Sequence, residues 1–182
     1  MSTVTILRRA TLVVGLAAAW LAFVPALALA QTAAPGPAKT VSGLGYGFFG
    51  VGAEACCGDS WATWHAGGGG EVVIADAFGI GAELGYLNWF EEGMDTIGVF
   101  STNGTYHFFP RQASRRLRPF VTGGYTLAFN NGGHENLFNV GGGVDYWMKK
   151  RVGLRIEFRD HVWSGSSQAT HFWSARFGVT VR

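Results

Sequence analysis

The sequence of 182 residues predicts an all-β fold: an eight-stranded, antiparallel, up-and-down transmembrane β-barrel that follows a cleavable N-terminal signal peptide. Three observations predict it. An apolar stretch near the N-terminus ends in a pattern typical of export signals. Most of the remaining chain alternates apolar and polar residues with a period of two. Aromatic and charged side chains also separate into two levels along the predicted strands, as the two interfaces of a membrane would require.

The first forty residues are predicted to lie outside the barrel. The stretch 10–29 is apolar and ends at Ala28-Leu29-Ala30, a small-x-small cleavage pattern. We therefore interpret residues 1–30 as a signal peptide of the general secretory route. An uncleaved membrane anchor is the alternative, because the stretch is nearly long enough to span a bilayer. Residues 31–40 contain Pro, Ala and polar residues and predict a disordered lead-in.

Residues 41–182 form the predicted barrel domain. In residues 152–159 one face carries Val, Leu, Ile and Phe, and the other carries Gly, Arg, Glu and Arg. This pattern indicates a strand between lipid and a polar interior. Eight such segments occur, each long enough to cross the hydrocarbon as a tilted strand. Their approximate ranges are 43–54, 61–74, 77–89, 96–109, 118–129, 136–148, 151–163 and 171–182.

The aromatic residues predict which end of the barrel faces outward. An even number of strands places both termini in the periplasm. Tryptophan then collects at the opposite, outer end, where connections of about five to seven residues are expected. The predicted outer aromatic girdle is Trp61, Trp64, Trp89, Trp163 and Trp173. The periplasmic level collects Phe78, Tyr106, Phe108, Phe109, Phe120, Tyr146 and Trp147.

The charges are sorted in the same direction. The chain has 14 Lys and Arg and 12 Asp and Glu, and Arg8 and Arg9 belong to the predicted signal peptide. The barrel is therefore nearly neutral, with its turn cations at the periplasmic end, and this distribution gives no support for nucleic-acid binding. The acidic outer loops could attract cations, including those that bridge lipopolysaccharide. Hydrophilic loops without a ligand are the favoured alternative.

Several charged residues fall on the inward faces of the predicted strands. The lumen of an eight-stranded barrel is only just wide enough for side chains, and buried charges must pair. We therefore predict a salt-bridge network that plugs the lumen, with inward glycines opposite the bulkier side chains. A narrow, porin-like channel lined by the same residues is the alternative. The predicted network is Glu71, Glu83, Asp145, Arg155, Glu157, Arg159 and Arg176.

Three segments carry a family resemblance: RPFVTGGY from Arg118, GGGVDY from Gly141 and VGLRIEFR from Val152. Together they resemble the OmpA/OmpX-like small outer-membrane β-barrels over most of residues 43–182. The resemblance implies the outer membrane of a Gram-negative bacterium, contact with its lipid and lipopolysaccharide, and insertion by the barrel-assembly machinery. It also implies a structural or surface-interaction role, and we expect a monomer. Such proteins usually end in an aromatic residue, whereas this chain ends in Arg182.

A lipid A-modifying enzyme is a less favoured alternative. In outer-membrane deacylases, one residue separates the catalytic His and Ser on a strand, and an acidic residue lies nearby. Here Asp160-His161 is followed by Ser164, Ser166 and Ser167 at other spacings, and His171 and Ser174 are also differently spaced. We therefore predict no catalytic residue, cofactor or metal ligand, and we interpret His65, His107 and His134 as solvated or internally satisfied.

The two cysteines, Cys56 and Cys57, are adjacent. Neighbouring cysteines rarely form an unstrained bridge, so we interpret the pair as a loop feature, either a vicinal disulfide or two thiols. A redox or metal-binding role is the alternative.

Overall fold

The computed structural model describes residues 41–74, 77–91, 93, 96–109, 116–165 and 168–182. The predicted signal peptide and lead-in lie outside the described residues. No helix in the described part of the chain is long and apolar enough to cross a membrane.

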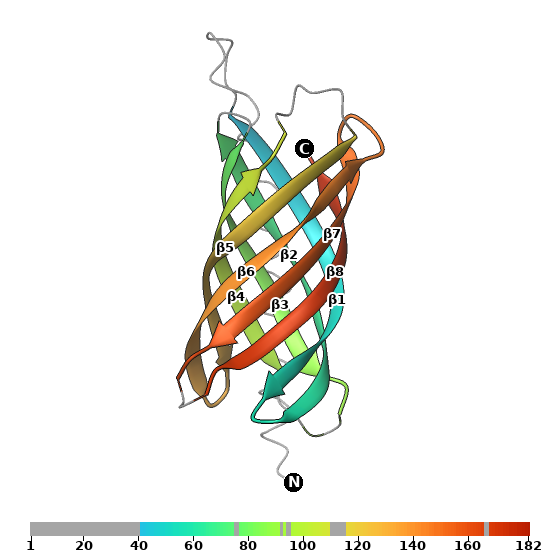
Figure 1. Cartoon of the computed structure of the whole chain (residues 1–182). Coiled ribbons are helices and arrows are strands. Elements are labelled where there is room, and N and C mark those ends of the chain that lie inside the picture. Colours follow the sequence, from blue (N-terminus) through green and yellow to red (C-terminus); the bar gives the residue numbers. More distant parts are fainter. Residues whose placement is uncertain (1–40, 75–76, 92, 94–95, 110–115, 166–167) are drawn as a thin grey trace, which may run out of the picture. The chain divides into compact units, whose positions relative to one another are not determined.

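The structure is a closed antiparallel barrel in which each strand pairs with its neighbour in sequence and β8 pairs with β1 (Figure 1). The prediction of eight strands is confirmed. The largest difference in bounds is at the start of β6, which begins at Gly133 rather than near residue 136. The strands are β1 (Ser42–Cys56), β2 (Asp59–Ile74), β3 (Phe78–Trp89), β4 (Ile97–His107), β5 (Leu117–Asn130), β6 (Gly133–Trp147), β7 (Val152–Trp163) and β8 (Thr170–Val181).

The outer face of the barrel is apolar and exposed. Phe49, Ile80, Phe138, Ile156 and Phe177 are each between 50% and 67% exposed. An exposed apolar surface that surrounds a closed sheet is a liability in water but is satisfied by lipid. The alternation seen in the sequence therefore separates a lipid-facing surface from the lumen.

The barrel has two mouths, which we name by the chain. The terminal mouth contains the start of β1, the end of β8 and the connections that follow β2, β4 and β6; it lies at the top of Figure 1, beside the C-terminus. The far mouth contains the connections after β1, β3, β5 and β7. If both termini face the periplasm, the far mouth is the outer one.

Two connections at the far mouth are shorter than predicted. Residues 57–58 join β1 to β2, and residues 131–132 join β5 to β6, so these are two-residue turns rather than loops of five to seven residues. Cys57 (φ 61°) and Gly58 (φ 95°) both have positive φ, as a type I′ hairpin turn requires. In the other turn, the Asn130 side chain accepts a hydrogen bond from the Gly132 amide at 2.8 Å. Both strand pairs therefore continue further than periodicity indicated.

Candidate functional site

The lumen contains all seven residues of the predicted charge network. None of them is more than 4% exposed. They come from β2, β3, β6, β7 and β8, so closure of the barrel brings together strands that are not neighbours in the sheet. The residues are Glu71, Glu83, Asp145, Arg155, Glu157, Arg159 and Arg176.

The centre of the network is a ring of alternating charge made by Glu83, Arg159, Glu157 and Arg176. Glu83 lies 2.7 Å from Arg176 and 3.6 Å from Arg159, measured between carboxylate oxygens and guanidinium nitrogens. Glu157 lies 2.5 Å from Arg159 and 3.4 Å from Arg176. Each of the four groups therefore has two partners of opposite sign, which offsets the large cost of removing charges from water.

The network continues from this ring toward the terminal mouth. Arg155 Nε donates a hydrogen bond to the second oxygen of Glu157 at 3.1 Å, and Arg155 lies 3.7 Å from Asp145. Aromatic rings cover the arginines. The Arg155 guanidinium lies 3.9 Å from the ring centre of Phe120, and that of Arg176 lies 3.3 Å from that of Phe48. These cation–π contacts stabilise the buried cations further.

Glycine makes room for these side chains. Glycines stand directly opposite three of these residues on the neighbouring strand: Gly81 opposite Glu71, Gly69 opposite Glu83 and Gly50 opposite Arg176. A Cβ built at Gly50 would lie 2.8 Å from Cγ of Arg176. The same arrangement holds on β6 and β8, where Gly143 faces Glu157, Gly141 faces Arg159 and Gly178 faces Arg155. The glycine richness of the chain therefore reflects the narrow lumen.

Three members of the network were missed in the sequence. His107, expected to be solvated or internally satisfied, is satisfied: it lies 2.6 Å from Glu71, which reaches it from β2 past the intervening strand β3. Arg118, counted among the cations at the periplasmic end, is 4% exposed and stands opposite Asp145. The Tyr46 hydroxyl donates a hydrogen bond to Glu83 at 3.1 Å. Alternation along β1, β4 and β5 could have put all three on the inward face, but it could not have identified their partners.

The wall made by β4, β5 and β6 is polar but uncharged. Ser101 and Thr126 hydroxyls are 2.8 Å apart. The Asn139 amide donates to Asn103 and to Thr126, both at 2.9 Å. This ladder satisfies buried polar groups at the side of the charged ring and fixes three strands to one another.

Of the five residues of the predicted outer girdle, two face outward. Trp173 is 41% exposed and stacks on Phe158 with ring centres 6.1 Å apart. Trp64 stacks on Phe49 at 6.3 Å. These two are placed to meet the membrane interface.

The other three tryptophans occupy inward register positions at the far mouth. Trp61, Trp89 and Trp163 stand opposite Glu54, Thr63 and Leu137, respectively. Directly opposite residues share a face of the sheet, so the girdle interpretation does not describe where these three point. Trp89 and Glu83 are an even number of residues apart on β3, so alternation along the strand already indicated that Trp89 shares the inward face of Glu83. The indole nitrogen of Trp89 instead donates to Glu54 at 2.7 Å.

Three carboxylates at the far mouth contact side chains of other strands. Glu135 accepts a hydrogen bond from the Trp163 indole at 3.0 Å. Asp160 lies 2.7 Å from Nδ1 of His171. Together with the Glu54–Trp89 pair, these contacts link strands at the rim of the barrel. The two cysteines at the β1–β2 turn form a disulfide bond.

The described residues of the alternative catalytic set do not converge. His161 is buried in the lumen, whereas Asp160, on the opposite face of the same strand, contacts His171. Ser164 is exposed, and Ser166 and Ser167 lie outside the described residues. Within the described part of the chain, no three His, Cys, Asp or Glu side chains cluster as a metal site would require.

Two solved structures have the same fold. The N-terminal β-barrel domain of OprF from Pseudomonas aeruginosa is 16% identical, with a TM-score of 0.56, and the match covers 76% of this chain and 96% of that one. Neisserial surface protein A (NspA) is 13% identical, with a TM-score of 0.63, and the match covers 79% of this chain and 99% of that one. No curated protein matches the sequence significantly.

The family is shown by the sequence itself. The family model for the outer membrane protein beta-barrel domain matches residues 16–182. Its match includes every strand of the barrel. The chain therefore belongs to the outer membrane protein beta-barrel domain family and is an integral β-barrel of the Gram-negative outer membrane.

Proposed function

We propose that this protein is a plugged barrel with a structural or surface-interaction role in the outer membrane, rather than an open channel. The observation that supports the proposal is the buried ring of Glu83, Arg159, Glu157 and Arg176, in which no side chain is more than 3% exposed. A hydrated ion that crossed the lumen would have to separate these pairs, and each separated charge would be left unpaired in a poorly solvated interior.

Conductance in a planar bilayer tests the plug. We expect the reconstituted wild-type protein to give no steady current. Lys150→Ala, at an exposed turn of the terminal mouth, is the matched control and should also be silent. Steady wild-type conductance that changes in Glu83→Ala or Arg155→Ala, but not in Lys150→Ala, would establish the alternative, a narrow channel lined by the network.

The structural role that we propose involves a monomer that contacts lipid and lipopolysaccharide and is inserted by the barrel-assembly machinery. The many exposed apolar side chains on the outer face support contact with lipid. At the far mouth, Glu54, Glu135 and Asp160 already have protein partners, which supports a stiff rim over a dedicated cation site. Barrel melting should therefore not depend on added divalent cations beyond their general effect on the membrane.

A further inference from the structure

Exposed cations gather on the rim of the terminal mouth, at the end of the barrel where Figure 1 marks the C-terminus. Arg116 precedes β5, and Lys149 and Arg151 lie in the turn between β6 and β7. All three are exposed, and none of them forms an ion pair with an Asp or Glu side chain in the described part of the chain. We call Arg116, Lys149 and Arg151 the basic rim.

Main-chain hydrogen bonds hold the basic rim together. The Arg116 carbonyl accepts a hydrogen bond from the Trp147 amide at 2.7 Å, which ties the start of β5 to the end of β6. The Arg151 carbonyl accepts one from the Arg182 amide at 3.0 Å. The Arg182 guanidinium in turn lies 4.0 Å from the ring centre of Trp147. Because β5, β6, β7 and β8 are consecutive neighbours in the barrel, the basic rim is one arc, and its backbone is held without using its own side chains.

Each residue of the basic rim is next in sequence to an apolar residue of the lipid-facing surface. These neighbours are Leu117, Met148 and Val152 for Arg116, Lys149 and Arg151, respectively. Leu117 is 54% exposed and Met148 is 45% exposed, and Val152 shares a face with exposed Val181, directly opposite on β8. Lys150, at the tip of the same turn, has no apolar neighbour and lies outside this set. Consecutive strand residues are only about 3.3 Å apart, so the basic rim lies at the height where acyl chains give way to headgroups.

The rim of the far mouth has the opposite charge. Asp59, Glu91 and Glu135 are exposed there, and no Lys or Arg within the described ranges lies on that rim. Carboxylates repel a phosphate, whereas cations attract it and donate hydrogen bonds to it. A ligand that meets a cation and a neighbouring lipid-facing side chain together has a charged head and an apolar tail. This combination favours a phospholipid over a soluble anion at the terminal mouth.

We propose that the basic rim binds the headgroup phosphates of anionic phospholipids in the leaflet at the terminal mouth. The phosphate oxygens accept charge-assisted hydrogen bonds from Arg116, Lys149 and Arg151, and the acyl chains lie against Leu117 and Met148. Several basic residues at a membrane surface act together on a layer of anionic headgroups, so the preference over a zwitterionic headgroup comes from the whole arc. This inference deepens the lipid contact proposed above and rests on it.

Native mass spectrometry of the folded protein in detergent micelles tests the headgroup preference. The probes are phosphatidylglycerol and phosphatidylcholine with identical acyl chains. We expect the wild type to bind phosphatidylglycerol about tenfold more tightly than phosphatidylcholine. Arg116→Ala, Lys149→Ala and Arg151→Ala together should weaken phosphatidylglycerol binding to the phosphatidylcholine level. Lys149→Glu alone should already weaken it by about threefold or more, which keeps the test decisive if the triple variant does not fold.

The matched control puts the same change in net charge on the far rim. Asn130→Asp, Asn131→Asp and Ser164→Asp together, all at exposed positions, should keep the preference for phosphatidylglycerol. Heat-dependent gel mobility shows whether each variant is a folded barrel.

The proposal is wrong if the folded wild type binds the two lipids equally, or if the far-rim variant loses as much preference as the basic-rim variant. It is also wrong if inorganic phosphate or peptidoglycan fragments displace phosphatidylglycerol more than sodium chloride of the same ionic strength does. Equal binding of the two lipids by a barrel that gives no current in a planar bilayer would overturn the headgroup preference alone and leave the proposed plug standing.

Discussion

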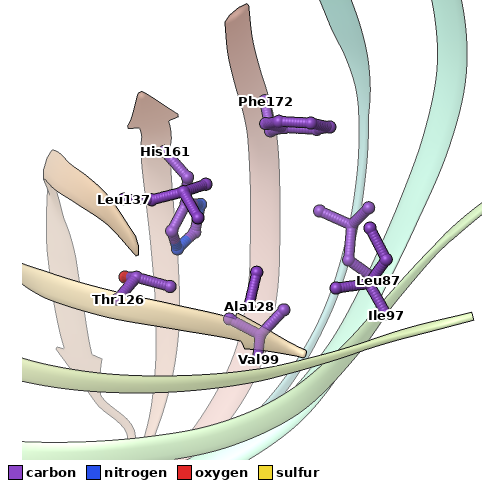
Figure 2. A pocket seen from close by; sticks show the side chains of 8 residues that line it. All are labelled: Leu87, Ile97, Val99, Thr126, Ala128, Leu137, His161 and Phe172. Atoms are coloured by element: carbon purple, nitrogen blue, oxygen red, sulfur yellow. The ribbon is translucent and has the colours of Figure 1, made fainter. Parts of the chain in front are cut away.

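The two halves of the lumen are filled with side chains of different chemistry. From the terminal mouth to mid-height, four carboxylates (Glu71, Glu83, Asp145 and Glu157) face four arginines (Arg118, Arg155, Arg159 and Arg176). Nearer the far mouth, Leu87, Val99, Leu137 and Phe172 line a small cavity together with Thr126 and His161 (Figure 2); we call this uncharged, largely aliphatic part the apolar half. The charged half is held by mutual pairing, so losing one partner harms the others. The apolar half is held by packing, so losing one side chain costs only what that side chain contributed.

The largest effect is expected for Glu157→Ala in the charged half. Glu157 is paired with Arg155, Arg159 and Arg176, and its removal leaves buried guanidinium groups short of a partner. We expect a loss of about 3–5 kcal/mol in the free energy of unfolding, measured by urea titration of tryptophan fluorescence in vesicles. Exposed Glu91→Ala is the control. Equal stability of the two variants would show that the ring contributes little.

A smaller loss is expected for Leu137→Ala in the apolar half. Leu137 is 5% exposed and lines the small cavity near the far mouth. We expect the free energy of unfolding to fall by about 2–3 kcal/mol, the lower part of the range for such truncations. Val140 is 60% exposed on the outward face of the same strand, and lipid chains can close around Val140→Ala. The expectation is wrong if Val140→Ala is less stable than Leu137→Ala in the same urea titration.

Converting part of the charged half into an apolar one sharpens the comparison further. Glu83→Met with Arg176→Met removes one carboxylate and one guanidinium that lie 2.7 Å apart. Because no charge is left alone, the double variant should lose no more than about 2 kcal/mol and less than either single variant. Additive losses in a double-mutant cycle would mean that the two residues act independently.

The smallest effect is expected outside the lumen, at the β1–β2 turn. Cys56→Ser with Cys57→Asn removes the disulfide but leaves Asn-Gly at the two positive-φ positions, the preferred sequence of a type I′ turn. A bridge between adjacent residues restricts the unfolded chain very little. Stability should change by less than about 0.5 kcal/mol, as judged by the same titration and by heat-dependent gel mobility. A large loss would give the disulfide a structural role.

Sequence periodicity was sufficient for the strands, their number and the two faces of the sheet. Alternation in VGLRIEFR on β7 depends only on the local geometry of a strand between lipid and a polar interior. The same parity was available for Trp89, which shares a face with Glu83, and it would have placed Trp89 inward. Phe120, which the sequence analysis grouped with the periplasmic aromatic level, is 2% exposed and lies inward on the same face as Arg118. The turn lengths were harder to predict from the sequence, because strand pairing that continues beyond the membrane is not marked by apolar residues.

The amino-acid sequence by itself determined an eight-stranded barrel with an apolar exterior, inward charges and inward glycines. Only the tertiary structure decided the partners. Glu83 meets Arg176 and Tyr46, and Glu71 meets His107, across strands that do not pair with each other. Alternation fixes the face of a residue but not its height, and height depends on the tilt and stagger that close the barrel. The small cavity near the far mouth arises for the same reason, because six strands contribute to its lining.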